Sequence, residues 1–455
     1  MNRRHFVKQT ALGLGAGLTI LNSAASVWGA AANDKVGLAL IGCGGRGTGL
    51  LHGFDYAPGR MTGFQEFDDV NVVYCCDAQR RRGEMTAERA NAKYTIDMRT
   101  VFDDKGVDAV VCALPDHWHA LAAIQACQAG KDVYTEKPCS HSAWEGQKMV
   151  EAARKHKRVV QHGTQSRSAP YCMEAKKYIE EGKLGNIHLC RVFNQKREMN
   201  SFRIRTGEQV PEGFDWDKWL GPAAQRLYSS TIHNGNWHEL WDFSGGDIIN
   251  DGVHQIDLAR WLIGKEFPKS VYASGGRYTD PDSDAETPDT LIATYEFDDM
   301  IMTAEQTLYT DYILKIDPTV RMTDTFPYWL QCATRIELYG TKGLMMVARH
   351  GGGWQVFARP QNRQPVVAVF EHGRFPDVEH KRNFLDCIKS RELPNADIET
   401  GHRSTLLIHY SNISYRLGGV KLEINQEDGT IVNNPATARL WKREYRAPYV
   451  VPEEV

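Results

Sequence analysis

After residue 30 the sequence has no long hydrophobic run, no extended basic cluster and no paired cysteines. No stretch there reaches the roughly 18 consecutive apolar residues that a membrane-spanning helix needs. No basic run is longer than Arg80-Arg81-Arg82, and the formal net charge is −3; both argue against nucleic acid as the main partner. The 10 cysteines include no C-x-x-C pair, so we expect free thiols rather than disulfides.

Residues 1–32 are predicted to be a targeting segment. The sequence Asn2-Arg3-Arg4-His5-Phe6-Val7-Lys8 resembles the twin-arginine signal, and an apolar region and small residues follow it. The alternative is a frayed amphipathic first helix, which Gly13, Gly15 and Gly17 disfavour. We therefore expect export by the twin-arginine pathway to the periplasm, with no membrane insertion after the signal is removed.

A glycine-rich turn follows a buried-strand pattern at residues 36–41. Gly42, Gly44 and Gly47 have the G-x-G-x-x-G spacing, with Gly45 and Arg46 inside it. This spacing gives a sharp turn, close approach to a pyrophosphate and tight packing of the next helix. The segment 48–54 that follows is typical of a helix start. The pattern favours a dinucleotide site, and an ordinary strand-to-helix turn is the alternative.

Residues 34–165 are predicted to form a Rossmann domain with a doubly wound parallel sheet. Strand patterns at 70–76, 107–114 and 132–135 alternate with helical stretches. Asp77 ends the first of these strands, where a carboxylate accepts hydrogen bonds from the adenosine ribose and repels a 2′-phosphate. Asp77 therefore favours NAD over NADP, although Arg80 and its neighbours could offset the repulsion. Capping of the following helix is the alternative role.

Ligands of such sheets bind at the carboxyl ends of the strands. Four loops converge there, and four independent loops are stronger evidence than the glycines alone. Besides the glycine loop and Asp77, the predicted cofactor contacts are Leu114, Pro115, Asp116, His117, His119, Glu136, Lys137 and Gln165.

The second half is predicted to be an α+β domain, residues 166–420, with an open, mostly antiparallel sheet. Strand patterns at 270–274, 290–297, 300–306 and 334–340 are separated by turns, which suggests a sheet with one face covered by helices. The uncovered face predicts a homo-oligomer, a dimer or a tetramer. Residues 421–455 are expected to be a polar, irregular C-terminal tail.

A helix is predicted over residues 245–262. Asp247, Asn250, His254 and Asp257 fall on one face of it, opposite Ile249 and its apolar neighbours. Such a row of polar side chains is either the solvent-exposed face of an ordinary helix or one wall of an active site.

Residues 231–242 combine tryptophans with histidines and amides. Flat aromatic faces beside polar groups suit a sugar ring, and an exposed loop pinned by its tryptophans is the alternative. A metal site built from His233, His238, Glu239 and His254 matches no tight zinc spacing, so no metal is expected. The predicted substrate contacts are Arg167, His233, Asn236, Trp237, His238 and Trp241.

The sequence resembles the glucose-fructose oxidoreductase, inositol dehydrogenase and rhizopine-catabolism (Gfo/Idh/MocA) family, in its secreted twin-arginine subgroup. Three motifs carry the resemblance: the glycine motif, residues 114–119 and Glu136-Lys137-Pro138. In that family the lysine of the E-K-P motif lies between nicotinamide and substrate and takes part in proton transfer, which the resemblance implies for Lys137. Its proline often forms a cis peptide. The 245–262 segment resembles the family's G-G-x-x-x-D-x-G-x-H-x-x-D helix, but Asn250 replaces the first aspartate; Asp247 is the candidate substitute and His254 the orienting or relaying group.

The resemblance implies an NAD-dependent oxidoreductase that oxidises a hydroxyl of a sugar or glycoside, at C3, to a 3-keto sugar. Because the periplasm has no NAD pool, export predicts a tightly bound cofactor that is regenerated in place. One alternative is redox glycoside cleavage by oxidation, elimination, water addition and reduction, as in the NAD-dependent α-N-acetylgalactosaminidases of the wider family. The other is a sugar-binding protein that retains NAD without catalysis.

Overall fold

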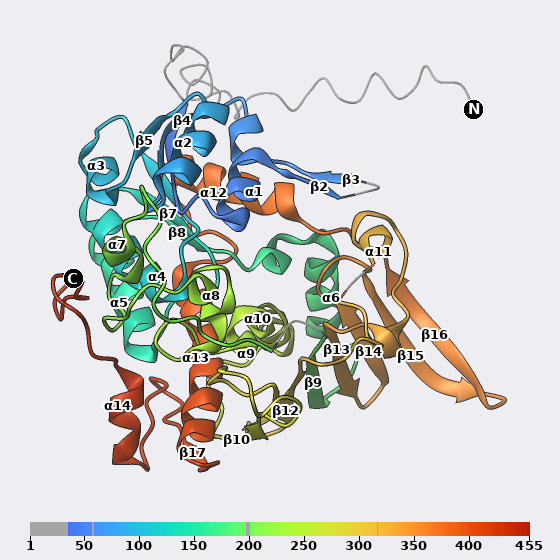
Figure 1. The fold of residues 1–455 in the computed structure, drawn as a ribbon. Coiled ribbons are helices and arrows are strands. Elements are labelled where there is room, and N and C mark those ends of the chain that lie inside the picture. The colour runs from blue at the N-terminus through green and yellow to red at the C-terminus, as the bar shows by residue number, and fades with distance from the viewer. Residues whose placement is uncertain (1–34, 57–58, 197–200, 316) are drawn as a thin grey trace, which may run out of the picture.

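The computed structural model describes residues 35–56, 59–196, 201–315 and 317–455. The predicted targeting segment, residues 1–32, lies outside the described residues. In the described part the chain forms a parallel sheet followed by a larger, mostly antiparallel sheet (Figure 1).

The first sheet is six-stranded in the described residues, with the order β5-β4-β1-β6-β7-β8, and all its pairs are parallel. This order is that of a doubly wound Rossmann sheet, which confirms the predicted fold class. Strand β1 is buried at every residue, as expected when helices cover both faces. The strands are β1 Val36–Ile41, β4 Val70–Cys76, β5 Lys93–Thr95, β6 Ala109–Cys112, β7 Asp132–Thr135 and β8 Val160–His162.

The helices of this domain begin where local chemistry favours it. Asp97 and Ser142 cap α3 and α5 by accepting a hydrogen bond from the backbone of the first turn. The elements are α1 Gly45–His52, η1 Phe64–Glu66, α2 Arg80–Arg89, α3 Met98–Asp103, α4 Asp116–Gln128, α5 Ala143–Lys155 and η2 Gln165–Ser168, with a small hairpin of β2 Phe54–Tyr56 and β3 Gly59–Met61.

The second sheet has the order β16-β15-β14-β13-β9-β12-β11-β10-β17. Its pairs are antiparallel except β9 with β12, which confirms the predicted mostly antiparallel sheet. The strands are β9 Ile187–Gln195, β10 Ser270–Gly276, β11 Thr290–Glu296, β12 Ile301–Thr307, β13 Arg335–Gly340, β14 Gly343–Ala348, β15 Trp354–Gln361, β16 Gln364–Glu371 and β17 Leu422–Glu423.

One face of this sheet is buried under helices and the other is exposed. Side chains of β10, β11 and β12 alternate between the core and the solvent, and Tyr272, Ile292 and Ile301 are exposed. Helices α6, α10 and α13 supply the opposing core residues. The remaining elements are α6 Pro170–Glu180, α7 Trp216–Leu220, α8 Ser230–His233, η3 Asn236–Glu239, α9 Asp247–Asn250, α10 Gly252–Ile263, α11 Pro318–Met322, η4 Trp329–Gln331, α12 Asp377–Ser390, α13 Ile398–Arg416, η5 Pro435–Thr437 and α14 Ala438–Trp441.

Two predictions need correction. The helix predicted over 245–262 breaks at Asp251 into α9 and α10. The tail is not simply irregular: β17 pairs with β10, α14 follows, and Val451 and Val455 are buried in the core of the Rossmann domain. Helices α12 and α13 also pack against that domain, so the chain returns to the first sheet from its second half.

Candidate active site

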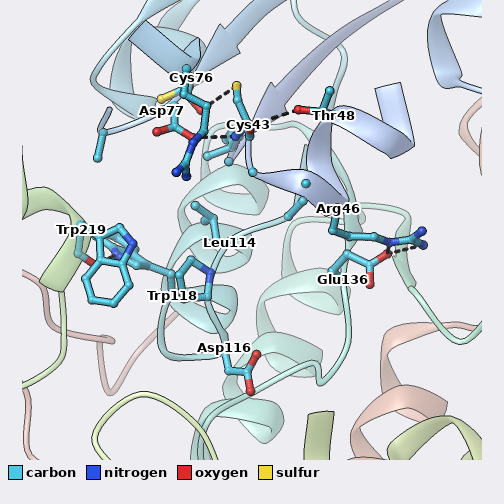
Figure 2. A pocket seen from close by; sticks show the side chains of 18 of the residues that line it. Cys43, Arg46, Thr48, Cys76, Asp77, Leu114, Asp116, Trp118, Glu136 and Trp219 are labelled. Atoms are coloured by element: carbon cyan, nitrogen blue, oxygen red, sulfur yellow. Dashed lines mark hydrogen bonds and ion pairs between the residues drawn. The ribbon is translucent and has the colours of Figure 1, made fainter. Parts of the chain in front are cut away.

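A cavity of about 1070 Å³ lies at the carboxyl ends of β1, β4, β6 and β7. The strand-end loops form one wall, and residues of 218–238, α9 and the C-terminal tail complete it. In Figure 2, Asp77 and Trp219 lie on one side of this cavity, and the Arg46–Glu136 pair lies on the other. The cavity therefore has two chemically distinct ends.

The glycine loop is shaped to hold a phosphate group. Gly42 has φ +93°, a conformation that L side chains rarely adopt. A Cβ on Gly47 would lie 1.9 Å from the carbonyl oxygen of Gly42, whereas a Cβ on Gly45 would meet nothing within 4 Å. The close contact packs α1 onto the turn, and the open space lets a ligand reach the backbone. Because no side chain caps the first turn of α1, its N–H groups stay available to an anion.

Asp77 connects the glycine loop to the next helix. Its carboxylate accepts hydrogen bonds from the backbone N–H groups of Cys43 and Gln79, both at 2.7 Å, and burial raises its pKa. Asp77 also lines the cavity beside Arg82. It therefore supports the start of α2 and faces the ligand space, so its two predicted roles are compatible.

Glu136, which is buried, and Arg46, whose side chain is 34% exposed, form an ion pair at the opposite side (Figure 2). Nε of Arg46 donates to Oε1 of Glu136 at 2.9 Å, and Nη2 of Arg46 lies 2.8 Å from the same oxygen. Burial alone would raise the pKa of Glu136, but the Arg46 cation holds it below its usual range. The pair keeps a charged carboxylate directly before Lys137.

Lys137 is held by the backbone and side chain of one residue. Its Nζ donates to the carbonyl oxygen of Asn250 at 2.6 Å and to Oδ1 of Asn250 at 2.7 Å. The Lys137-Pro138 bond is cis, as the resemblance implied. The amide of Asn250 donates in turn to Asp247 Oδ1 at 3.0 Å, so the Asn250 amide orientation follows from both contacts.

Behind Asn250 lies a buried network of charges. Asp247 accepts from Asn194 at 2.8 Å and pairs with Lys196 at 3.3 Å. Lys196 also pairs with Asp251 at 2.6 Å, and Arg349 reaches Asp251 at 3.1 Å. The break between α9 and α10 brings the Asp251 carboxylate into contact with these cations. No local sequence pattern specifies this contact.

Two histidines near Lys137 are neutral at neutral pH. Burial, with Arg349 and Lys137 nearby, holds the pKa of His254 well below its usual range, and the described residues provide its ring with no hydrogen-bond partner. Burial also lowers the pKa of His238. Since Nδ1 of His238 lies 2.7 Å from the Gly235 carbonyl oxygen, Nδ1 carries the proton and Nε2 remains an acceptor.

Most predicted site residues gather around one cavity. Its walls are formed in part by Gly42, Gly44, Gly45, Arg46, Asp77, Leu114, Pro115, Asp116, Glu136, Lys137, His233, Trp237, His238 and Asn250.

Several predicted contacts lie elsewhere because longer-range partners hold their side chains. His117 is fully buried between Trp219 and Phe243. His119 bridges the carbonyl oxygens of Leu114 and Pro138, which ties together two loops of the cavity.

The buried Arg167 pairs with Asp257 at 2.9 Å, and neither residue lines the cavity. Asp257 therefore does not share the face predicted for Asp247, Asn250 and His254. Trp241 packs on Arg416 and Tyr415, and the Asn236 amide donates to Thr231. Gln165 donates to the Tyr134 hydroxyl. Gly47, Asp247 and His254 support the site from outside the cavity lining.

The cavity also contains residues that the sequence pattern did not single out. Trp118, Lys218 and Trp219 line it together with Lys315, Pro448 and Tyr449. Trp118 lies within the motif at residues 114–119, whereas Tyr449 comes from a tail with no site signal.

Among the described residues, no helix is long and apolar enough to cross a membrane. In the same part of the chain, no group of three or more His, Cys, Asp or Glu residues is arranged to hold a metal ion. All 10 cysteines are buried and free, which confirms the prediction of free thiols.

Curated relatives resemble this chain over different lengths. The uncharacterized oxidoreductase YrbE of Bacillus subtilis is 25% identical over 276 residues, 60% of this chain and 65% of that protein. Levoglucosan dehydrogenase of Pseudarthrobacter phenanthrenivorans is 30% identical over 198 residues, 43% of this chain and 42% of that protein; both matches span less than two thirds of those relatives. The NAD(+)-dependent scyllo-inositol 2-dehydrogenase of Bacillus subtilis is 24% identical over 366 residues, 78% of this chain and 88% of that protein.

Solved structures share the fold. Aldose-aldose oxidoreductase from Caulobacter crescentus has a TM-score of 0.62 at 17% identity, covering 86% of this chain and 100% of that chain. The WlbA dehydrogenase from Bordetella pertussis has a TM-score of 0.61 at 20% identity, covering 86% and 99%.

Residues 36–164 match the oxidoreductase family with an NAD-binding Rossmann fold, and residues 172–346 match the GFO/IDH/MocA C-terminal domain. The chain therefore belongs to the GFO/IDH/MocA oxidoreductase family.

Proposed function

We propose that this protein is an NAD-dependent oxidoreductase that oxidises a hydroxyl group of a sugar or glycoside. The observation that carries the proposal is the position of Lys137. It lines the same cavity as the glycine loop, and its Nζ donates to both oxygens of Asn250. The dehydrogenase relatives act on levoglucosan and scyllo-inositol, which are polyhydroxylated rings, and this supports the substrate class.

The cavity residues fit NAD. The free backbone at Gly44 and Gly45 and the N-terminus of α1 suit a pyrophosphate, and Asp77 suits the ribose hydroxyls. Bound NAD would supply an acceptor for the hydride that leaves the carbinol carbon of the substrate. The protein must then take the hydroxyl proton and orient the ring.

Lys137 is suited to take that proton. In the neutral amine, the two N–H groups donate to the two oxygens of Asn250, which leaves one lone pair for the substrate hydroxyl. Asn250 fixes this direction without adding a negative charge beside the amine. Asp247 holds the Asn250 amide, so Asp247 is a positioning residue.

His238 and Trp237 supply contacts suited to a sugar. Their rings stack at 3.6 Å between centroids, and both line the cavity. Nε2 of His238 accepts a hydrogen bond from a sugar hydroxyl, while the indole offers a flat apolar face to C–H groups. His254, which is neutral and lies outside the cavity lining, is proposed as a positioning residue behind Asn250.

We also propose which carbon is oxidised, in which compartment the protein acts and that it forms an oligomer. We place the oxidation at C3, giving a 3-keto sugar, with a tightly bound cofactor that is recycled in place. The twin-arginine-like sequence supports export to the periplasm. The exposed face of the second sheet, with Tyr272, Ile292 and Ile301, supports a homo-oligomer.

The test incubates the purified protein with a panel of glycosides and follows products by mass. Loss of two hydrogens, with a ketone at C3 by NMR, is the expected result, and Lys137→Ala serves as the control. Release of an aglycone without net oxidation would instead favour the redox glycosidase. Binding without either product would favour the non-catalytic sugar-binding alternative.

A further inference from the structure

Two segments far apart in the sequence close the Asp77 end of the cavity. Residues 213–221 and residues 443–449 meet there, and we call them together the clasp. Lys218, Trp219, Pro448 and Tyr449 line the cavity from these segments. In Figure 2 the labelled Trp219 and Trp118 stand on the same side as Asp77.

Residues 213–221 are attached to the Rossmann domain through its backbone. The N–H of Arg80 donates to the Gly213 carbonyl at 2.8 Å, and the N–H of Asp215 donates to the Ala78 carbonyl at 2.9 Å. Trp219 stacks on Trp216 at 4.6 Å with an interplanar angle of 10°. This half of the clasp is therefore rigid and fixed directly beyond Asp77.

Residues 443–449 are anchored by a buried ion pair. Arg443 Nε lies 2.6 Å from Oε1 of Glu145, whose side chain is fully buried, and Nη2 donates to the His117 carbonyl at 2.6 Å. The Tyr445 hydroxyl donates to the same Glu145 oxygen at 3.0 Å. Val451 and Val455 then enter the Rossmann core, which fixes the segment on both sides.

The two halves are joined at the surface. Arg446 donates to the carbonyl oxygens of Gly221 at 3.1 Å and Asp217 at 2.9 Å, and it pairs with the Asp217 carboxylate at 2.5 Å. The Tyr449 hydroxyl donates to Asp217 at 3.1 Å, and its ring meets the edge of Trp118 at 5.4 Å. Since the Asp217 side chain is 58% exposed, this junction contributes little to global stability and can open separately.

We infer that the clasp holds the adenine end of the dinucleotide and makes the cofactor a resident group that exchanges slowly. The inference rests on the proposed function. A carboxylate at the Asp77 position binds the adenine ribose, so the base extends beyond it to Trp118, Trp219 and Tyr449. These aromatic side chains suit a flat base, and the base leaves only when the Arg446–Asp217 junction opens.

The test measures exchange, not turnover. The holoenzyme is loaded with NADH and chased with excess NAD, and the loss of bound NADH fluorescence gives the dissociation rate. Arg446→Ala is expected to raise dissociation and association rates together by about tenfold, since it removes a gate. Tyr449→Ala is expected to raise mainly the dissociation rate, by about tenfold or more, since it removes a contact with the base.

The matched control is Arg439→Ala, an exposed arginine of α14 in the same tail. It should exchange NADH at the wild-type rate. Wild-type exchange in both clasp variants, with NADH still bound, would overturn the clasp and leave the proposed function intact. An equal acceleration in Arg439→Ala would also overturn it. A wild-type protein that binds no NADH would overturn the proposed function itself.

Discussion

The two ends of the cavity are built from different kinds of interaction. At the Lys137 end, buried charges and amides are arranged in a chain, and Lys196 and Asp247 are each 1% exposed. At the clasp end, aromatic rings and a half-exposed ion pair join segments from two distant parts of the sequence. We propose that the first end orients a proton acceptor, whereas the second controls entry and exit of the cofactor.

This difference separates chemistry from exchange. A change at Lys137 should reduce turnover and leave cofactor binding largely intact. A change in the clasp should alter cofactor exchange and leave the chemical step largely intact. A Lys137 variant that altered cofactor binding, or a clasp variant that altered the chemical step, would contradict this separation.

The largest effect is expected for Lys137→Ala. Turnover should fall by about 10²- to 10⁴-fold because the general base is lost, while NADH affinity should change little. Steady-state kinetics with the best glycoside of the panel, together with NADH titration, measures both. Lys342→Ala, on the exposed turn after β13, is the matched control. Near-normal turnover in Lys137→Ala would contradict the assignment.

The anchor of the clasp should matter most for folding. Arg443→Met leaves the buried Glu145 carboxylate without its cation, which typically costs about 3–5 kcal/mol. Denaturant unfolding should show this loss. Lys442→Met removes the neighbouring exposed pair with Glu453 and should cost less than about 1 kcal/mol. Equal stability of the two variants would mean that the tail is not anchored as described.

His233 makes the clasp side of the cavity sensitive to acid. Burial lowers its pKa from 6.5 to about 4, so the unfolded chain binds this proton more readily below pH 6.5. Stability should therefore fall as the pH falls from 7 to 4. His233→Phe should recover about 1–2 kcal/mol of that loss at pH 5. Thermal melts of both proteins at pH 7 and pH 5 give the comparison, and an identical pH dependence would contradict the role of His233.

The smallest effect is expected for Asn250→Asp. A carboxylate beside Lys137 would stabilise a positive charge on its Nζ and weaken it as a proton acceptor, so kcat at pH 7 should fall by up to about tenfold. Asn186→Asp, an exposed asparagine before β9, should leave kcat unchanged. An unchanged kcat in Asn250→Asp would mean that Lys137 is not the proton acceptor.

The Lys137 end could be predicted from the sequence because short motifs specify it. The bounds of β4 and β7 coincide with the predicted strands, and their loops meet at one sheet edge as parallel topology requires. Resemblance supplied the pairing of Lys137 with the helix that begins after Gly245-Gly246. The break at Asp251 was missed because its cause is contact with Lys196, Lys315 and Arg349, which are distant in the sequence.

At the clasp end Asp77 was predicted, but the return of the C-terminal tail to the cavity was not, for a similar reason. His117 and Arg167 looked like ligand contacts beside strand ends, yet Trp219 and Asp257 hold them in the interior. Tyr449 reaches the cavity only because the tail returns to the Rossmann core. Polarity and periodicity describe local exposure, and they carry no information about such long-range returns.

The most direct test of the account is the identity of any dinucleotide carried by the purified protein. The protein is passed through gel filtration, denatured, and the released nucleotide is identified and counted by mass spectrometry. We predict about one NAD or NADH per chain. Protein that carries none, and that takes up none when NAD is added, would contradict the central claim.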